Sequence, residues 1–351
     1  MLDLTQDVRT LTAAIVDVES VSGAERVLAD EVERALGALP HLTVDRSGET
    51  VVARTALGRA ERVLIAGHLD TVPVHANLPS RVEGDLLYGC GTSDMKAGVA
   101  VALKLAAMVP EPNRDVTFVF YDCEEIEAER NGLTRVARDH AGWLAADFAV
   151  LMEPTDGVIE GGCQGTLRAD VLVTGKRAHS ARSWFGVNAI HGIEPVLARL
   201  NAYQARQPVV DGLRYHEGLN AVGVRGGVAG NVIPDSCVVT VNYRFAPDLG
   251  LTEAREHVRE VFDGFEVSFT DGAPAARPGL THPVAAAFTA AVGGEPRAKL
   301  GWTDVARFAA LGVPAVNYGP GDPNLAHQQG EYVSLSKIVE SERAMLDWLT
   351  K

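Results

Sequence analysis

Three short apolar runs constrain the fold of this 351-residue chain more than any other feature. They cover residues 62–67, 116–121 and 148–152, and a helical stretch rich in Ala, Val and Leu, residues 97–108, lies between the first two. A strand that is apolar throughout has to be covered on both faces, and strands that alternate with helices form layered sheets of that kind. The sequence therefore predicts an α/β fold with helices on both faces of a central sheet.

The middle of the chain has a different pattern. Apolar and polar residues alternate there, as in half-exposed strands, over residues 166–175, 221–228 and 236–245. Helical periodicity marks residues 188–203 and 252–262, and the apolar α/β pattern returns near residue 280. We therefore expect a discontinuous main domain, residues 1–165 and 280–351, interrupted by a smaller α+β domain, residues 166–279.

The two ends of the main domain also show helical patterns. Residues 4–39 have helical periodicity, and Ser22 with Glu25 fits a capping box ahead of a helix. Further helices are expected at residues 283–292 and 304–311, followed by a strand at 315–318.

Charge and composition exclude several classes of protein. Acidic residues outnumber basic residues by 46 to 32, and the resulting formal charge of −14 repels nucleic acid and anionic membranes. No apolar run approaches the roughly 20 residues of a membrane helix, and the N-terminus lacks the pattern of a signal peptide. None of the four cysteines forms a C-x-x-C pair, so reduced thiols are expected. We expect a cytoplasmic protein that acts on a small molecule.

Five clusters of polar residues fall at predicted strand ends or in the loops that follow, which is where open α/β sheets bind ligands. They are Gly67-His68-Leu69-Asp70, the stretch from Tyr88 to Gly98 that contains Asp94, Cys123-Glu124-Glu125, Met152-Glu153 and Ala326-His327. Each has an ordinary explanation, such as a surface histidine or a solvated acidic loop. Together they supply two imidazoles and at least three carboxylates, a donor set that suits zinc, cobalt or manganese.

The spacing within these clusters fits metal chemistry. Asp70 lies two residues after His68, so in an extended chain both side chains point to one side and the carboxylate can orient the imidazole. The two oxygens of Asp94 could bridge two cations, whereas a phosphate site would need further glycines. Glu124 and Glu125 repel each other unless a cation lies nearby. Two bridged metals are a known device for amide hydrolysis.

Other catalytic schemes are less well supported by the residues. The chain contains no G-x-S-x-G motif for an acyl-serine enzyme. Cys90 and Cys123 are possible nucleophiles, but neither has an evident histidine partner, and packing is the simpler interpretation.

In this order and context, the five clusters resemble the di-zinc peptidase family of succinyl-diaminopimelate desuccinylase, acetylornithine deacetylase, aminoacylase and glutamate carboxypeptidase. The resemblance spans almost the whole chain. It implies a mixed-sheet catalytic domain with an inserted dimerisation, or lid, domain, and a homodimer that binds two Zn²⁺, for which Co²⁺ or Mn²⁺ can substitute. It also implies a cis peptide bond after Asp94.

The same resemblance implies a role for each residue. His68 and Glu153 would hold one metal, Glu125 and His327 would hold the other, and Asp94 would bridge the two. Asp70 would orient His68, and Glu124 would be the general base. In the inserted domain, His179 would stabilise the oxyanion across a dimer. The substrate-binding residues would be Asn231, Arg244, Arg182 and Thr303.

Within the family, the chain most resembles the actinobacterial succinyl-diaminopimelate desuccinylases. The implied reaction converts N-succinyl-LL-2,6-diaminopimelate and water to LL-2,6-diaminopimelate and succinate, in lysine biosynthesis. Relatives carry a basic pair where this chain has Cys163 and Gln164, which leaves recognition of the acyl group to Arg182 or Arg244. A deacylase or dipeptidase for another N-acyl amino acid, such as acetylornithine, and a non-catalytic metal- or partner-binding relative are the alternatives.

Overall fold

A computed structural model describes residues 2–351 and divides them into two compact units. Unit 1 contains the described chain up to Gly161, together with Pro278–Arg297 and Arg307–Lys351. Unit 2 contains Gly162–Arg277 and Ala298–Ala306. The expected main domain included residues 298–306, but these group with unit 2, where the Gln164 amide donates to the Gly301 carbonyl and the Trp302 indole to the Pro274 carbonyl.

Unit 1 is built on an eight-stranded sheet in the order β1-β2-β6-β3-β7-β18-β8-β17. Strands β6, β3, β7 and β18 run parallel, and antiparallel strands flank them, so the sheet is mixed. A separate three-stranded sheet has the order β19-β5-β4. The strands are β1 (Thr43–Ser47), β2 (Thr50–Arg54), β3 (Arg62–His68), β4 (Arg81–Glu83), β5 (Leu86–Tyr88), β6 (Asp115–Tyr121), β7 (Phe148–Leu151), β8 (Glu160–Gly161), β17 (Arg297–Ala298), β18 (Ala315–Asn317) and β19 (Tyr332–Ser334).

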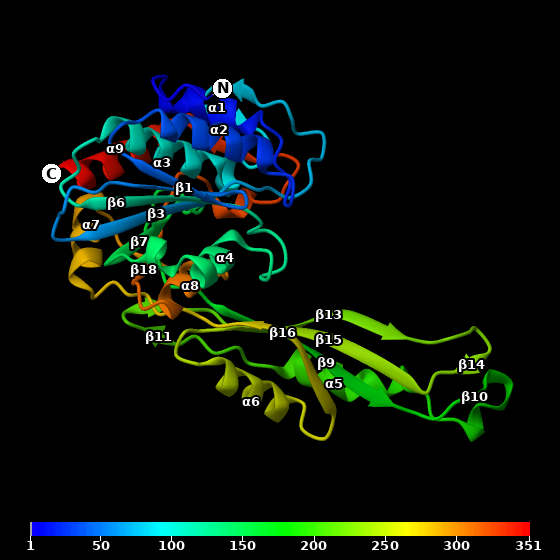
Figure 1. Cartoon of the computed structure of the whole chain (residues 1–351). Coiled ribbons are helices and arrows are strands. Elements are labelled where there is room, and N and C mark those ends of the chain that lie inside the picture. Colours follow the sequence, from blue (N-terminus) through cyan, green and yellow to red (C-terminus); the bar gives the residue numbers. More distant parts are fainter. Residues whose placement is uncertain (1) are drawn as a thin grey trace. The chain divides into compact units, whose positions relative to one another are not determined.

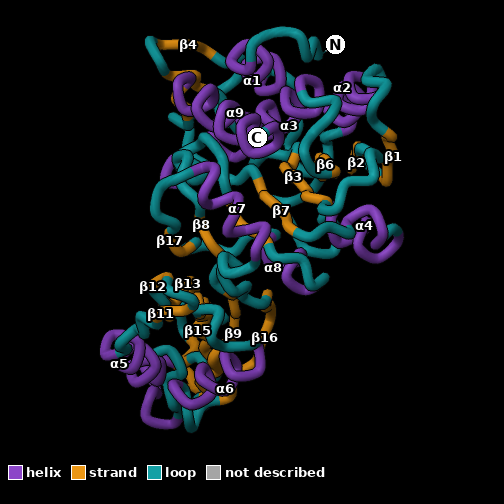
Figure 2. The backbone as a smooth tube through the Cα atoms, turned by 90° about the vertical axis from the view of Figure 1, so that its left-hand side faces the viewer, coloured by secondary structure: helices purple, strands orange, loops and turns teal. Residues whose placement is uncertain are grey.

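Helices cover this sheet, as its apolar strands require. Figure 1 shows α1, α2, α3 and α9 on one side and α4 on the other, and in Figure 2 the same four helices again lie on one side of β3, β6 and β7. The α-helices are α1 (Val8–Val16), α2 (Arg26–Gly37), α3 (Ala97–Met108), α4 (Gly132–Asp139), α7 (Pro283–Val292), α8 (Val305–Ala310) and α9 (Leu335–Thr350). The shorter turns are η1 (Thr92–Lys96), η2 (Ala141–Leu144) and η5 (Pro323–Leu325).

The core of unit 1 explains why the three apolar runs are continuous. All seven residues of β6 are buried, and so are all four of β7. Helix α3 buries every residue from Ala97 to Ala106, because the sheet lies on one side of it and α1 and α9 pack on the other. Each fully buried aliphatic side chain contributes about 1.5–3 kcal/mol of transfer free energy, which holds this layer together.

Unit 2 has one covered sheet face and one open face. Its main sheet has four strands in the order β13-β15-β9-β16, and an apolar cluster joins the inward residues of this sheet to α5 and α6. The pairs β10-β14 and β11-β12 form two separate two-stranded sheets. Burial alternates along β9, as the sequence pattern predicts for a half-exposed strand. The elements are β9 (Gly165–Thr174), β10 (Ala178–His179), η3 (Ser180–Phe185), η4 (His191–Ile193), α5 (Glu194–Ala202), β11 (Val209–Val210), β12 (Leu213–Arg214), β13 (Gly218–Gly226), β14 (Val232–Ile233), β15 (Ser236–Phe245), α6 (Leu251–Val261) and β16 (Glu266–Ala273).

The expected α/β class with a mixed sheet is confirmed, and several local predictions need correction. The helix expected at residues 188–203 is shorter, since the regular part, α5, begins at Glu194. Helices α4 and α9 and strand β16 were not predicted. The capping box at Ser22 and Glu25 is wrong, because neither side chain caps α2 and the Ser22 hydroxyl donates to Asp70 instead.

Two further expectations concern the whole described chain. All four cysteines are free and buried, as expected for reduced thiols. Within residues 2–351, no helix combines the length and the apolar character that crossing a membrane would require.

Candidate metal centre

The carboxyl ends of the four parallel strands meet at one edge of the unit 1 sheet, and each supplies one candidate ligand. His68 is the last residue of β3, Glu125 follows β6, Glu153 follows β7, and His327 follows β18 by way of η5. Parallel strands end on the same side of a sheet, so residues far apart in the sequence converge there. This edge is where the sequence analysis expected the site.

Asp94 reaches the same place from a different element. It lies in η1, a distorted turn that leads into α3, and the peptide bond between Asp94 and Met95 is cis, as the family resemblance implied. Helix α3 packs so close to the end of β7 that a Cβ atom at Gly98 would lie 2.1 Å from the Met152 carbonyl oxygen. Glycine at position 98 therefore allows the Asp94 turn to lie beside Glu153.

The donor atoms form two overlapping groups that share Asp94. His68, Asp94 and Glu153 make one group, and Asp94, Glu125 and His327 make the other, with ligand atoms within 4.8 Å of one another in each. One carboxylate oxygen of Asp94 lies 3.1 Å from His68 Nε2, and its second oxygen lies 3.6 Å from His327 Nε2. Two ligand atoms on one tetrahedral ion lie about 3.3 Å apart, so these separations suit two cations that share a carboxylate.

The two groups differ in their access to solvent. The His68 and Glu153 side of the site is buried, at 1% and 5% exposure. The imidazole of His327 is 51% exposed, although it lies 2.9 Å from a carboxylate oxygen of Glu125. An ion at the first group would therefore be enclosed, whereas an ion at the second would face the solvent side.

The histidines attract protons strongly in the metal-free chain. Burial alone would lower the pKa of His68, but Asp70 and Asp94 outweigh burial and raise it well above its usual value. The hydrogen bond to Glu125 raises the pKa of His327 to about 9, against the effect of partial burial. The neighbouring carboxylates thus favour the protonated form of both histidines. Metal binding would displace the added protons.

Asp70 lies beside His68, as expected, and it also binds the loop that carries Glu124 and Glu125. The Asp70 main-chain carbonyl lies 3.0 Å from His68 Nδ1, closer than its carboxylate, which lies 3.5 Å away. The carboxylate accepts the amide hydrogens of both Glu124 and Glu125, each at 3.0 Å, and the Ser22 hydroxyl at 2.7 Å. Burial opposes ionisation of Asp70, but His68 and the two amides lower its pKa to about 2.

Glu124 lies beside the ligands. Its carboxylate belongs to a third group with His68 and Glu125, again with donor atoms within 4.8 Å. The preceding residue, Cys123, has a left-handed backbone with φ of 58°, which a non-glycine residue adopts rarely. This turn directs two successive glutamates into the same cluster from one strand end.

Glu331 is a residue of the site that the sequence analysis missed. Its carboxylate is buried and accepts the amides of Gly91, Ser93 and Asp94 at 2.7–3.0 Å, so it holds the loop that carries Asp94. Burial raises its pKa to about 7. The sequence carries no local signal for this role, because the amides that it binds lie 237–240 positions away.

In unit 2, Arg182 lies three positions after His179, and Asn231 contacts the same segment through a backbone hydrogen bond. His179 ends β10, which pairs with β14, and the Ser180 amide donates to the carbonyl of Asn231. The Ala181 amide donates to His179 Nδ1 at 3.0 Å, so Nδ1 is the acceptor and Nε2 carries the hydrogen in the neutral ring. Arg182 follows in η3 and is exposed.

Arg244 and Thr303 lie in other parts of unit 2. Arg244 is on β15, where its Nε donates to Asn242, while Thr303 is buried and its carbonyl accepts the Cys163 thiol. Cys163 and Gln164 are both buried, and the Gln164 side-chain amide donates to the His216 carbonyl. Burial raises the pKa of Cys163 to about 11, so neither Cys163 nor Gln164 carries a charge at neutral pH.

Comparison with known proteins points to one family. The family model described as peptidase family M20/M25/M40 matches residues 64–351, which include every candidate metal ligand.

Two relatives match along nearly their whole length. A protein of Mycobacterium tuberculosis, whose name provisionally describes it as succinyl-diaminopimelate desuccinylase DapE, is 59% identical over 341 residues, 96% of each chain. A Corynebacterium glutamicum protein named succinyl-diaminopimelate desuccinylase is 48% identical over 361 aligned positions, covering all of this chain and 98% of the relative.

Solved structures share the fold at low sequence identity. A tripeptidase from Staphylococcus aureus superposes with a TM-score of 0.78 at 19% identity, covering 99% of this chain and 98% of that one. A Bacillus subtilis protein described as a dinuclear metal binding peptidase from the M20 family gives a TM-score of 0.70 at 18% identity, covering 97% and 96%. These likenesses concern the fold alone.

Proposed function

Because this chain belongs to peptidase family M20/M25/M40, we propose that it is a two-metal amide hydrolase that converts N-succinyl-LL-2,6-diaminopimelate and water to succinate and LL-2,6-diaminopimelate. The observation that carries the proposal is the sharing of Asp94 between two groups of nitrogen and oxygen donors. A single structural ion would need only one such group. Two groups bridged by a carboxylate are the arrangement that hydrolytic two-metal sites use.

The proposed ligands follow from this geometry. His68 and Glu153 would hold one ion, Glu125 and His327 would hold the other, and Asp94 would contribute a ligand to both groups. Imidazole and carboxylate donors without thiolate suit Zn²⁺, and Co²⁺ or Mn²⁺ can substitute at such sites. When bound, the ions supply Lewis-acid activation of water and of the amide carbonyl.

Glu124 is the proposed general base. Its backbone amide is fixed to Asp70, and its carboxylate lies within the ligand cluster without being needed by either bridged group. It takes a proton from the attacking water and returns it to the leaving amine, as a carboxylate placed beside the reacting atoms can do.

His179 is the proposed donor to the oxyanion. Because the Ala181 amide occupies Nδ1, the neutral ring presents an Nε2 hydrogen, which is what a developing negative charge requires. Asn231, Arg182, Arg244 and Thr303 are the proposed substrate contacts. Arg244 and Arg182 are suited to carboxylates through the planar donor fork of the guanidinium group.

The substrate assignment is supported by the two relatives and tested by a substrate panel. The succinyl compound is expected to be cleaved with a kcat/KM at least about tenfold above that for acetylornithine and other N-acyl amino acids, because the succinyl group adds a carboxylate that the proposed contacts Arg182 and Arg244 would bind. Chelation followed by stepwise addition of Zn²⁺ should abolish and then restore this activity. Faster cleavage of the acetyl compound would reject the desuccinylase assignment. Metal binding without hydrolysis of any compound in the panel would reject the proposal that the chain is an amide hydrolase.

We also propose a cytoplasmic homodimer that pairs through unit 2. Strand β13 is an outer strand of its sheet and exposes Val222 at 60% and Val224 at 52%. Outer strands with exposed apolar residues favour pairing with another chain. Val224→Lys should therefore shift the protein from twice the 37.3 kDa chain mass towards the single chain in sedimentation analysis. As a control, the neighbouring polar exchange Asn220→Ser should leave the mass unchanged.

A further inference from the structure

Glu25 is a buried carboxylate that has no place in the chemistry described above. It is 1% exposed and directly precedes helix α2. An ionisable group is seldom buried so completely unless hydrogen bonds compensate for its lost hydration. The identity of its partners therefore indicates its role.

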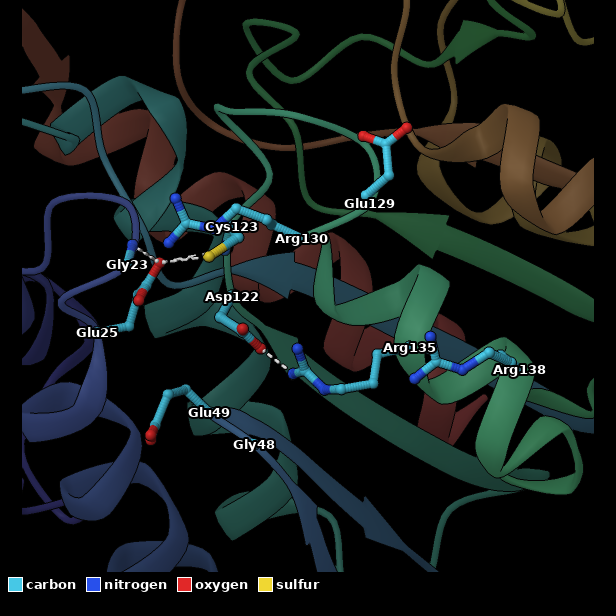
Figure 3. Close-up of a pocket in the computed structure, with 10 residues that line it drawn as sticks. All are labelled: Gly23, Glu25, Gly48, Glu49, Asp122, Cys123, Glu129, Arg130, Arg135 and Arg138. Atoms are coloured by element: carbon cyan, nitrogen blue, oxygen red, sulfur yellow. Dashed lines mark hydrogen bonds and ion pairs between the residues drawn. The ribbon is translucent and has the colours of Figure 1, made fainter.

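The hydrogen-bond donors to Glu25 belong to two loops, and all of them reach the same oxygen. Oε1 accepts the Gly23 amide at 2.8 Å, the Cys123 amide at 3.1 Å and the Cys123 thiol at 3.4 Å. Figure 3 shows the carboxylate directed at Gly23 and Cys123 on one wall of a cavity of about 370 Å³. Glu25 thus fixes the residue directly before Glu124.

The loop from Cys123 to Glu125 is held by three amide hydrogen bonds in succession. Glu25 accepts the amide of Cys123, and Asp70 accepts those of Glu124 and Glu125. The left-handed conformation of Cys123, with φ of 58°, is a strained one that needs such external support. Without the bond to Glu25, the loop would lose the contact nearest to this strained residue.

The segment before Glu25 connects the same loop to β3. The Ser20 hydroxyl donates to the Leu69 carbonyl at 2.6 Å, and the Ser22 hydroxyl donates to Asp70 at 2.7 Å. The segment between α1 and α2 therefore contacts the loop after β3 and the loop after β6, both of which carry proposed site residues.

We propose that Glu25 is a positioning residue that fixes the backbone of Cys123 and thereby sets the place of the Glu124 carboxylate. The proposal rests on the proposed role of Glu124 as general base. It concerns the acceptor oxygen of Glu25 rather than its charge, since one oxygen takes these hydrogen bonds. A displacement of a catalytic group by about 1 Å can lower a rate by about 100-fold, so a missing hydrogen bond at this position is sufficient to affect catalysis.

Two variants of Glu25 distinguish the effect of its acceptor oxygen from the effect of its negative charge. Glu25→Ala removes the acceptor, and kcat should fall about 10- to 100-fold with KM changed less than about threefold. Glu25→Gln keeps an oxygen at the Oε1 position and removes the charge, so kcat should stay within about threefold of the wild type. A Gln variant as slow as the Ala variant would overturn the proposal.

Asp115 provides a matched control for loss of a buried carboxylate. It is 4% exposed, accepts the amides of Leu57 and Arg59, and begins the same strand, β6, after which Cys123 follows. Asp115→Ala should lower the melting temperature as Glu25→Ala does, but leave kcat unchanged. Equal losses of kcat in the two Ala variants would reduce the role of Glu25 to general stability and overturn the proposal.

A measurement that needs no substrate keeps this test independent of the proposed reaction. Amide hydrogen exchange, followed by mass spectrometry on a peptide that contains residues 119–126, should accelerate in Glu25→Ala and not in Glu25→Gln or Asp115→Ala. If the wild type fails to cleave the succinyl compound, the proposed function fails while this result stands. If exchange in the peptide is unchanged in Glu25→Ala, the positioning role itself is rejected.

Discussion

At the scale of single residues, we propose different tasks for identical side chains of the site because their surroundings differ. Glu124 and Glu125 are neighbours held by the same carboxylate of Asp70, yet Glu125 lies 2.9 Å from His327 and shares the second ligand group with Asp94. The sequence pattern predicted both as site residues from their place after an apolar strand. It could not reveal Glu25 or Glu331, because each acts through backbone amides that are distant in the sequence.

Replacing Glu124 by Gln tests the general base. The amide cannot accept the proton from water, so kcat should fall by about 10³-fold or more, while both metals remain bound because the ligands are intact. Metal analysis and steady-state kinetics on the same sample check this outcome. Glu127 lies on the same loop and is exposed, so Glu127→Gln should retain activity within about twofold. A normal rate in the Glu124→Gln variant would remove Glu124 from this role.

Metal affinity should depend on pH through the two histidines. The pKa of His327 is raised to about 9 in the metal-free chain, so binding at its group displaces a proton below that pH. Affinity for the more exposed ion should therefore rise about tenfold per pH unit between about pH 7 and pH 8 and level off above about pH 9. Calorimetry in buffers of different ionisation enthalpy measures the released proton. A pH-independent affinity would contradict the raised pKa.

The raised pKa of His327 should also make the stability of the metal-free chain depend on pH. A folded pKa above the unfolded value of about 6.5 means that His327 contributes stability that is fully present below about pH 6.5. This contribution is lost as the pH rises through about 9. Urea unfolding of the chelated protein at several pH values should show it, and the metal-loaded protein should not.

At the scale of elements, the buried strands were predictable from the sequence. The contacts that hold the loops after these strands were not. The apolar runs predicted β3, β6 and β7 closely, because continuous burial leaves a plain signal in composition. Strand β16 and the short helix α4 were missed, since an exposed outer strand and an eight-residue helix have weak patterns. The turn η1 depends on Glu331, which no local pattern indicates.

Replacing Glu331 by Gln tests how the η1 loop is held. Oε1 accepts the amides of Ser93 and Asp94 while Oε2 accepts that of Gly91, so a glutamine must turn its NH₂ towards a donor. The expected cost is about 1–3 kcal/mol of unfolding free energy, with weaker metal binding through Asp94. Chemical denaturation and metal titration measure both. Glu340, an exposed residue on α9, is a control whose change to Gln should have little effect.

At the scale of the whole molecule, the site couples distant segments of unit 1. The proposed ligands come from four strand ends and one turn, so bound ions add stability only when the entire unit is folded. The prediction of the α/β class followed from the apolar runs, and the expectation of an inserted segment at residues 166–279 followed from the change in apolar pattern near residues 166 and 280. The grouping of residues 298–306 with unit 2 did not, because it depends on contacts with Gln164 and Pro274.

Removal of the metals should lower the melting temperature of the whole of unit 1. Free metal at about 100 times its dissociation constant contributes about 2.7 kcal/mol, which corresponds to roughly 5–10 °C for a unit of this size. Differential scanning calorimetry with and without a chelator measures the shift, and Asp94→Asn should abolish most of it. A shift that persisted in that variant would place the stabilising ions elsewhere.

The order of the ligands along the chain has a consequence for biosynthesis. His68, Asp94, Glu125 and Glu153 all precede unit 2 in the sequence, whereas His327 and Glu331 follow it. A chain that is still being synthesised therefore carries most of the donors early. It gains the final imidazole, together with the carboxylate that steadies Asp94, only after unit 2 has been made. Under the proposed ligand assignment, a chain that ends before His327 would therefore lack one ligand of the second group, and full occupancy by two ions would require a chain that extends past unit 2.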